Sequence, residues 1–247
     1  MTLSTFGCIA AITQHSAGFA DAARGNLEAR VEHCPEWSVA DMVVHLTDVH
    51  WFWATIVEGR LDAPPAQELR PPRAADEDLV DTFVSGAARL VEVLREADQS
   101  DFCWTWAGWK QDVEFVTRHQ VQEAAVHHWD AVHAAGDALV LDPSVSVDAV
   151  GEFLAFSVAS EDDPDDPPET VLDGEFTLRA TDTGDSWAVS DGSRPGTAHI
   201  AAGTTAGPVV EAPAADLLLW LYGRVDLGAS ALPNGLLARF RGICFTD

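Results

Sequence analysis

The feature that most constrains this chain is a run of nine residues, 161–169, made only of aspartate, glutamate and proline. The run has no apolar side chain to bury, and its prolines cannot continue a helix or a sheet interior, so we expect it to lie outside any packed core. The hydrophobic patterns before and after it differ. We therefore predict one domain over 1–160, a linker over 161–169 and a second domain over 170–247.

The first part of the chain has the hydrophobic period of α-helices. One apolar stripe recurs at helical spacing through Leu79, Phe83, Ala87, Leu90 and Leu94. Ser38, followed three residues later by Asp41, predicts the N-cap of another helix. Long helices are expected over 3–23, 39–59, 76–97 and 112–135, with a further helix over 145–160. Four long helices predict a four-helix bundle.

Beyond the acidic run the hydrophobic period changes to two. Phe176, Leu178 and Ala180 alternate with polar residues, and Gly184 then turns the chain toward 187–189, which predicts a β-hairpin. Pro213 is expected at position N1 of a helix. Further strands are predicted near 199–201 and 209–210, and helices over 214–222 and 236–240. The second part therefore reads as a small α+β domain.

The charge of the chain excludes several kinds of partner. Forty acidic and 14 basic residues give a formal net charge of −26, which repels nucleic-acid phosphates and anionic lipids. We expect neither a nucleic-acid nor a membrane partner.

The sequence has no run of eighteen apolar residues and no signal-peptide pattern at its start, which predicts a cytoplasmic protein. Its four cysteines are far apart, so no disulfide framework or thiolate zinc finger is predicted.

The fourth predicted helix carries a candidate metal site. Glu123 and His127 are four residues apart, so their side chains share one face and can converge on one ion. Zn²⁺ accepts both donor types. A third ligand in a bundle normally comes from a facing helix, and the second helix offers His45 and His50. These two lie about 140° apart around the helix, so only one is expected to face the core, and His45 is the better candidate.

The same pattern has a simpler interpretation, because an ExxxH spacing is short and common. It also describes an exposed glutamate–histidine pair beside a buried, hydrogen-bonded histidine. His128 and His133 lie off the stripe and are expected in solvent. The tryptophan-rich segment 103–109, with Trp106 and Trp109, is explained by packing in the core and loops, and alternatively as the aromatic wall of a small-molecule pocket.

Segments 34–46 and 123–131 resemble the mycothiol-dependent maleylpyruvate isomerase family. The first reads CPEWSVAD with His45 ten residues after the proline, and the second reads EAAVHHWDA. The likeness continues through 179–187, 216–224 and 236–240, and so covers nearly the whole chain. It implies a DinB-like four-helix bundle followed by a small sterol-carrier-like α+β domain. The chain has one lysine among its 14 basic residues and abundant alanine, a composition typical of actinobacteria, which use mycothiol as a thiol.

This resemblance implies a divalent metal, usually zinc, held by His45, Glu123 and His127, with mycothiol as the reacting thiol. The metal would stabilise the thiolate, and the implied reaction is cis–trans isomerisation of maleylpyruvate. Two alternatives stay open: a mycothiol S-transferase that acts on an electrophilic small molecule, and a non-catalytic, metal-stabilised module that binds a small molecule or a partner. Family members often have histidine before the glutamate, where this chain has Gln122, which bears on the surroundings of the metal.

Maleylpyruvate is a dianion, and the acidic protein offers it no favourable long-range field, so an arginine is required to bind it. Arg224 follows a predicted helix within a segment that matches the family, and it is the leading catalytic candidate. Alternatively, an arginine stands at this position because the negative end of the helix dipole favours a cation there. Arg118, beside the metal stripe, is the second candidate. Trp106 and Trp109 are the candidates to line the thiol pocket.

Overall fold

The structure, a computed structural model, describes residues 2–159, 169–228, 232 and 235–245. It divides into two compact units. One consists of residues 3–106 and 110–141, and the other of 1–2, 107–109 and 142–247. The predicted linker lies outside the described residues except for Glu169. The predicted division into domains over 1–160 and 170–247 stays a prediction.

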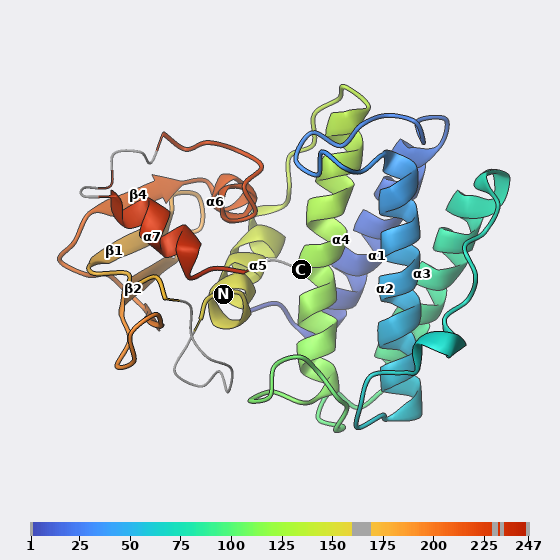
Figure 1. The fold of residues 1–247 in the computed structure, drawn as a ribbon, viewed down its shortest axis with the longest axis horizontal. Coiled ribbons are helices and arrows are strands. Elements are labelled where there is room, and N and C mark those ends of the chain that lie inside the picture. Colours follow the sequence, from blue (N-terminus) through green and yellow to red (C-terminus); the bar gives the residue numbers. More distant parts are fainter. Residues whose placement is uncertain (1, 160–168, 229–231, 233–234, 246–247) are drawn as a thin grey trace. The chain divides into compact units, whose positions relative to one another are not determined.

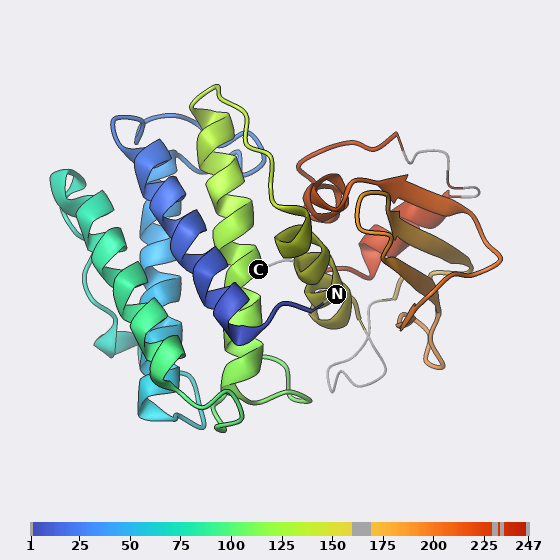
Figure 2. The same cartoon turned by 180° about the vertical axis from the view of Figure 1, so that it is seen from behind.

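The first unit is a bundle of four long helices, which are seen side by side in Figures 1 and 2. Helix α1 packs against α4 and α3, and α2 packs against α3, whereas α2 and α4 touch over a short stretch only. The rings of Phe19 and Phe83 meet in the core with centroids 4.9 Å apart. The helices are α1 (Thr5–Ala23), α2 (Val39–Gly59), α3 (Leu79–Glu96) and α4 (Val113–Ala134). The bundle is therefore least closed between α2 and α4.

The start of α2 is fixed by a capping box, as the sequence predicts. The Ser38 hydroxyl accepts a hydrogen bond from the Asp41 N–H, and the Asp41 carboxylate accepts one from the Ser38 N–H at 2.9 Å. These two bonds satisfy backbone donors that the first turn cannot pair internally. The Ser38 hydroxyl also donates to the Asp41 carboxylate at 2.6 Å, and this bond, together with the one from the Ser38 N–H, lowers the pKa of Asp41. The cap therefore sets the register from which His45 projects.

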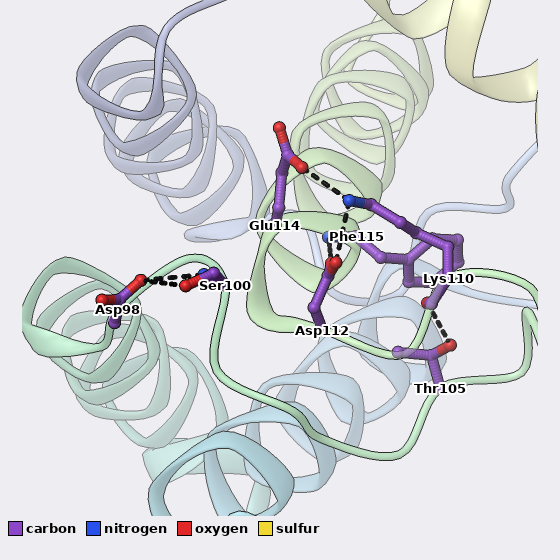
Figure 3. A network of polar contacts seen from close by, with 7 residues as sticks. All are labelled: Asp98, Ser100, Thr105, Lys110, Asp112, Glu114 and Phe115. Atoms are coloured by element: carbon purple, nitrogen blue, oxygen red, sulfur yellow. Dashed lines mark hydrogen bonds and ion pairs between the residues drawn. The ribbon is translucent and has the colours of Figure 1, made fainter.

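A polar network precedes α4 and holds its first turn in place (Figure 3). The Asp112 carboxylate accepts a hydrogen bond from the Phe115 N–H at 3.0 Å and so caps the helix. The Lys110 ammonium lies 2.8 Å from Asp112 and 2.7 Å from Glu114, and hydrogen bonds to both carboxylates raise its pKa. The Thr105 hydroxyl donates to the Lys110 carbonyl at 2.8 Å. These contacts fix the turn from which Glu123 and His127 are presented.

Three helix starts differ from the sequence prediction by two residues or more. Helix α1 begins at Thr5 rather than at residue 3, because Ser4 caps it. A short 3₁₀ turn, η2 (Asp76–Asp78), precedes α3, which begins at Leu79 rather than at residue 76. Helix α5 (Pro143–Phe156) begins two residues earlier than expected, because Asp142 caps it and Pro143 occupies its first turn. α5 packs against a later helix, α6 (Ala214–Leu221), and thus groups with the second unit.

The second unit contains a mixed four-stranded sheet in the order β3-β2-β1-β4. The predicted hairpin is confirmed as β1 paired antiparallel with β2, whereas β4 pairs parallel with β1. The rings of Phe176 and Phe240 meet in its core, with centroids 5.0 Å apart. Pro213 occupies the N-cap of α6 and not position N1, because its ψ of 148° is outside the helical range. The remaining elements are β1 (Glu175–Ala180), β2 (Ser186–Asp191), β3 (Ala198–Ala202), β4 (Val209–Ala212) and α7 (Leu236–Gly242).

The chain is thus a helical bundle plus a small mixed sheet with helices, which agrees with the predicted α plus α+β class. Within the part of the chain that the structure describes, no helix combines the length and apolar character needed to cross a membrane.

Candidate metal centre

Three predicted ligands converge where α2 faces α4. The Nε2 atom of His45 lies 2.9 Å from the Oε1 atom of Glu123, and Nε2 of His127 lies 3.6 Å from the same oxygen. One ligand atom from each residue falls within 4.8 Å of the other two. Two imidazoles and one carboxylate match the donors of catalytic zinc sites, which keep a fourth position open. The donor set fits a divalent metal ion, and the ligand role of these residues stays a proposal.

The second nitrogen of His127 is engaged from behind. Its Nδ1 lies 3.2 Å from Oδ2 of Asp130, whose side chain has no exposed surface. A proton on Nδ1 that is shared with Asp130 leaves the lone pair of Nε2 directed toward Glu123. Carboxylates placed in this way behind a histidine fix the tautomer and raise the basicity of the ligand. The geometry therefore prepares His127 to bind a cation through Nε2.

Glu123 is an ionised carboxylate among imidazoles, with a side chain 15 % exposed. Burial raises its pKa, but the charge of His127, the hydrogen bond from His45 and the charges of His45 and His119 together outweigh burial and lower the pKa to about 2. The carboxylate is thus charged throughout the neutral range. A negative group that needs nearby positive charge is a natural position for a metal cation.

His50, the alternative ligand on α2, faces a different neighbour. Its ring stacks on Phe83 of α3 with centroids 5.1 Å apart, and the side chain is buried. Burial lowers its pKa to about 4, and its Nδ1 has no hydrogen-bond partner among the described residues. His50 is therefore a neutral core residue, which favours His45 as the residue that faces α4.

The expectation that His128 lies in solvent is wrong. His128 is buried, and its Nδ1 lies 3.0 Å from Nδ1 of His15 on α1. Gly18 makes room for this ring, since a Cβ atom built there would lie 2.3 Å from it. His133, in contrast, is exposed as expected.

A cavity of about 600 Å³ opens beside His45. Its walls are largely aromatic, and its only lining cation among the described residues is Arg70, which follows the short turn η1 (Gln67–Leu69) and pairs with Asp48. Trp53 is fully buried in this wall, and its indole N–H has no acceptor in the described part of the chain. The cavity is lined by Glu36, Trp37, Asp41, Val44, His45, Asp48, Val49, Trp51, Phe52, Trp53, Gln67, Arg70 and Trp106.

Of the two tryptophans predicted to line the pocket, the structure places only Trp106 there. Trp106 lines the cavity, where its ring centroid lies 4.7 Å from that of Trp53. Trp109 is half exposed and belongs to the other compact unit. Gln122 is buried, and its amide nitrogen lies 2.9 Å from Nδ1 of His119. Trp106 is thus the one of the two tryptophans that the structure brings to the candidate site.

Neither predicted arginine is among the described residues that line the cavity. Arg118 is half-buried on α4. Arg224 belongs to the second unit, where it donates to the Tyr222 carbonyl at 2.8 Å and lies over the Tyr222 ring, 5.8 Å from its centroid. Their catalytic roles stay predictions.

Sequence reasoning missed Asp48 and Arg70. Asp41, His45, Asp48 and Phe52 recur every three or four residues, so the helical period of α2 held the signal for Asp48. Arg70 lies in a proline-rich loop that has no repeating hydrophobic pattern. Only the path of the loop in the folded chain brings Arg70 close to α2.

Comparison with known families matches residues 9–132 to the family described as the mycothiol maleylpyruvate isomerase N-terminal domain. The match spans half of the 247 residues and includes all three candidate ligands. No curated protein and no solved structure matches the chain.

Proposed function

This chain belongs to the mycothiol maleylpyruvate isomerase N-terminal domain family, and from that membership we propose that it is a metal-dependent enzyme that uses mycothiol as its reacting thiol. The observation that carries the proposal is the convergence of His45, Glu123 and His127 beside an aromatic cavity. We extend the proposal to a DinB-like assignment for the bundle and a sterol-carrier-like one for the α+β unit. Because mycothiol is an actinobacterial thiol, an actinobacterial source and a cytoplasmic location belong to the same proposal.

The three residues would hold a divalent metal, for which zinc suits the donor set best. When bound, the metal supplies positive charge that lowers the pKa of a thiol, so that its sulfur is a thiolate near neutral pH. Asp130 keeps the His127 ring oriented. Glu123, ionised among imidazoles, would supply negative charge to hold the cation.

The cavity is suited to the remaining parts of the reactants. Its volume of about 600 Å³ lies within the range of small-molecule sites. Trp37 packs on His45 with ring centroids 4.9 Å apart, and Trp106 closes the wall near Trp53. These rings would flank the sulfur of a thiol bound at the centre.

The charge of the cavity supports one reaction over the other. Glu36, Asp41 and Asp48 line it, whereas Arg70, the one arginine among its described lining residues, is already paired with Asp48. A dianion such as maleylpyruvate gains little from this lining. An uncharged electrophile needs no cation: the thiolate sulfur forms a bond to carbon, and the leaving group departs with the bonding electron pair. We therefore favour mycothiol S-transfer to an uncharged small molecule.

Isomerisation of maleylpyruvate remains the second candidate. In that reaction the thiolate adds to the conjugated cis double bond, the resulting single bond rotates, and elimination restores the thiol with a trans alkene. It requires a cation from elsewhere in the chain, and Arg224 and Arg118 are the proposed sources. The family name supports this candidate.

A paired assay tests the proposal. Zinc-loaded protein and mycothiol are offered monochlorobimane, an uncharged electrophile, and maleylpyruvate in separate reactions. We expect conjugation of the bimane well above the uncatalysed rate, lost in Glu123→Gln and kept in His199→Ala, an exposed histidine on β3. Faster turnover of maleylpyruvate than of the bimane would favour the isomerase. No rate above background with either compound contradicts the enzymatic proposal and leaves the non-catalytic binding module.

A further inference from the structure

A second group of metal-ligating side chains lies outside the candidate centre. We propose that Glu32, His33 and His133 form a separate binding site for a divalent transition metal such as Zn²⁺, which fastens the segment between α1 and α2 to the end of α4. One ligand atom from each of the three residues falls within 4.8 Å of the other two. The proposal goes beyond the proposed function and does not depend on it.

The three side chains meet from two distant parts of the sequence. Nε2 of His133 lies 2.8 Å from Oε2 of Glu32, and the rings of His33 and His133 stack with centroids 5.9 Å apart. Trp129, one turn earlier on α4, stacks on His133 at 4.7 Å and so restrains that ring. Two imidazoles and a carboxylate are again a donor set that Zn²⁺ accepts.

The electrostatic surroundings favour a cation at this place. His133 lies in the last turn of α4, where the helix dipole presents its negative end. The net charge of −26 adds a long-range attraction for dications.

A metal here would act on a segment that also reaches the cavity. The Val31 N–H donates to the Trp37 carbonyl at 3.1 Å and closes the turn that carries Glu32 and His33. Trp37 in turn packs on His45 and lines the cavity. Fastening this turn to α4 therefore restrains one aromatic wall of the candidate site.

Zinc titration of the full chain against a chromophoric chelator tests the proposal, with circular dichroism to check folding. The His45→Ala/His127→Ala variant, which lacks the first candidate centre, should keep one bound zinc ion. Adding His133→Ala or Glu32→Gln should remove it, whereas the controls His199→Ala and Glu28→Gln, both exposed, should not. If the His133→Ala addition leaves zinc affinity unchanged, the proposal is overturned.

A second readout works even where the double variant does not fold. Zinc should slow amide hydrogen exchange in residues 31–37 of the otherwise unaltered chain, and the His133→Ala variant should lose this effect. Equal protection in both proteins contradicts the proposal. If His45, Glu123 and His127 do not bind zinc, the result is different. The unaltered chain would then bind a single zinc ion, and the His133→Ala substitution would remove it.

Discussion

Nδ1 of His127 lies 3.2 Å from Oδ2 of Asp130, three residues further along α4, and the Asp130 side chain is fully buried. Spacing along the helix brings the two groups together, and burial keeps water from competing for the histidine proton. Residue 130 thus belongs to the candidate centre although it cannot itself be one of its three ligands.

Asp130→Asn should weaken zinc binding by about tenfold, because a neutral amide supports the basicity of His127 less than a carboxylate does. Competition with a chelator of known affinity measures the change. Asp137→Asn, at an exposed position beyond the same helix, serves as the control. Equal affinity in the two variants would show that Asp130 has only a structural role.

Glu123→Ala and His127→Ala should each abolish zinc binding at this centre, since either change leaves two ligands for an ion that needs at least three from the protein. Far-ultraviolet circular dichroism should show the bundle still helical. His50→Leu and His128→Ala should keep the zinc, which metal analysis after gel filtration would measure. Loss of zinc in His50→Leu but not in His45→Ala would mean that the ligand on α2 is misassigned.

Asp48→Asn should improve the use of an anionic substrate. The change removes a carboxylate from the cavity and releases Arg70 from its ion pair. We expect KM for maleylpyruvate to fall roughly fivefold, equivalent to about 1 kcal/mol, with little change for monochlorobimane. Asp101→Asn breaks a comparable pair with Arg60 outside the cavity and should change neither value. A fall in KM for both substrates would point to a general loosening of the cavity.

His50 should make the metal-free protein sensitive to acid. Burial lowers its pKa from 6.5 to about 4, so between these values the unfolded chain binds a proton that the folded chain does not. The stabilising contribution is complete above pH 6.5 and is lost as the pH falls toward 4, on the order of 3 kcal/mol in all.

Urea unfolding at pH 7 and pH 5 in the presence of a chelator measures this dependence. The free energy of unfolding should fall less in His50→Leu than in the unaltered chain, whereas His199→Ala should behave as the unaltered chain does. Identical falls in all three proteins would contradict the assignment of a neutral, buried His50.

The features predicted correctly from the sequence are those determined by residues close together in the sequence. Ser38 and Asp41 mark the start of α2, and Glu123 and His127 share a helix face, because caps and periods are fixed within a few residues. His128 escaped the same reasoning, since its burial depends on the space that Gly18 leaves on another helix.

Residues in loops were beyond this reasoning for a related reason. Arg70 reaches the cavity, and His33 approaches His133, only through the tertiary path of the segments that carry them. Loop paths follow from packing against the helices and not from a repeating pattern. Helical spacing therefore finds groups on helices, including His45 on the facing helix, but not groups that loops bring to the site.

His45, Glu123 and His127 are proposed to hold a metal that converts mycothiol to its thiolate. Calorimetric titration of zinc-loaded protein with mycothiol at pH 7, in two buffers of different ionisation enthalpy, measures proton release on binding. We predict release of about one proton per bound thiol, since coordination deprotonates it, and none in Glu123→Ala. Binding without proton release, or the same release in Glu123→Ala, would contradict the claim.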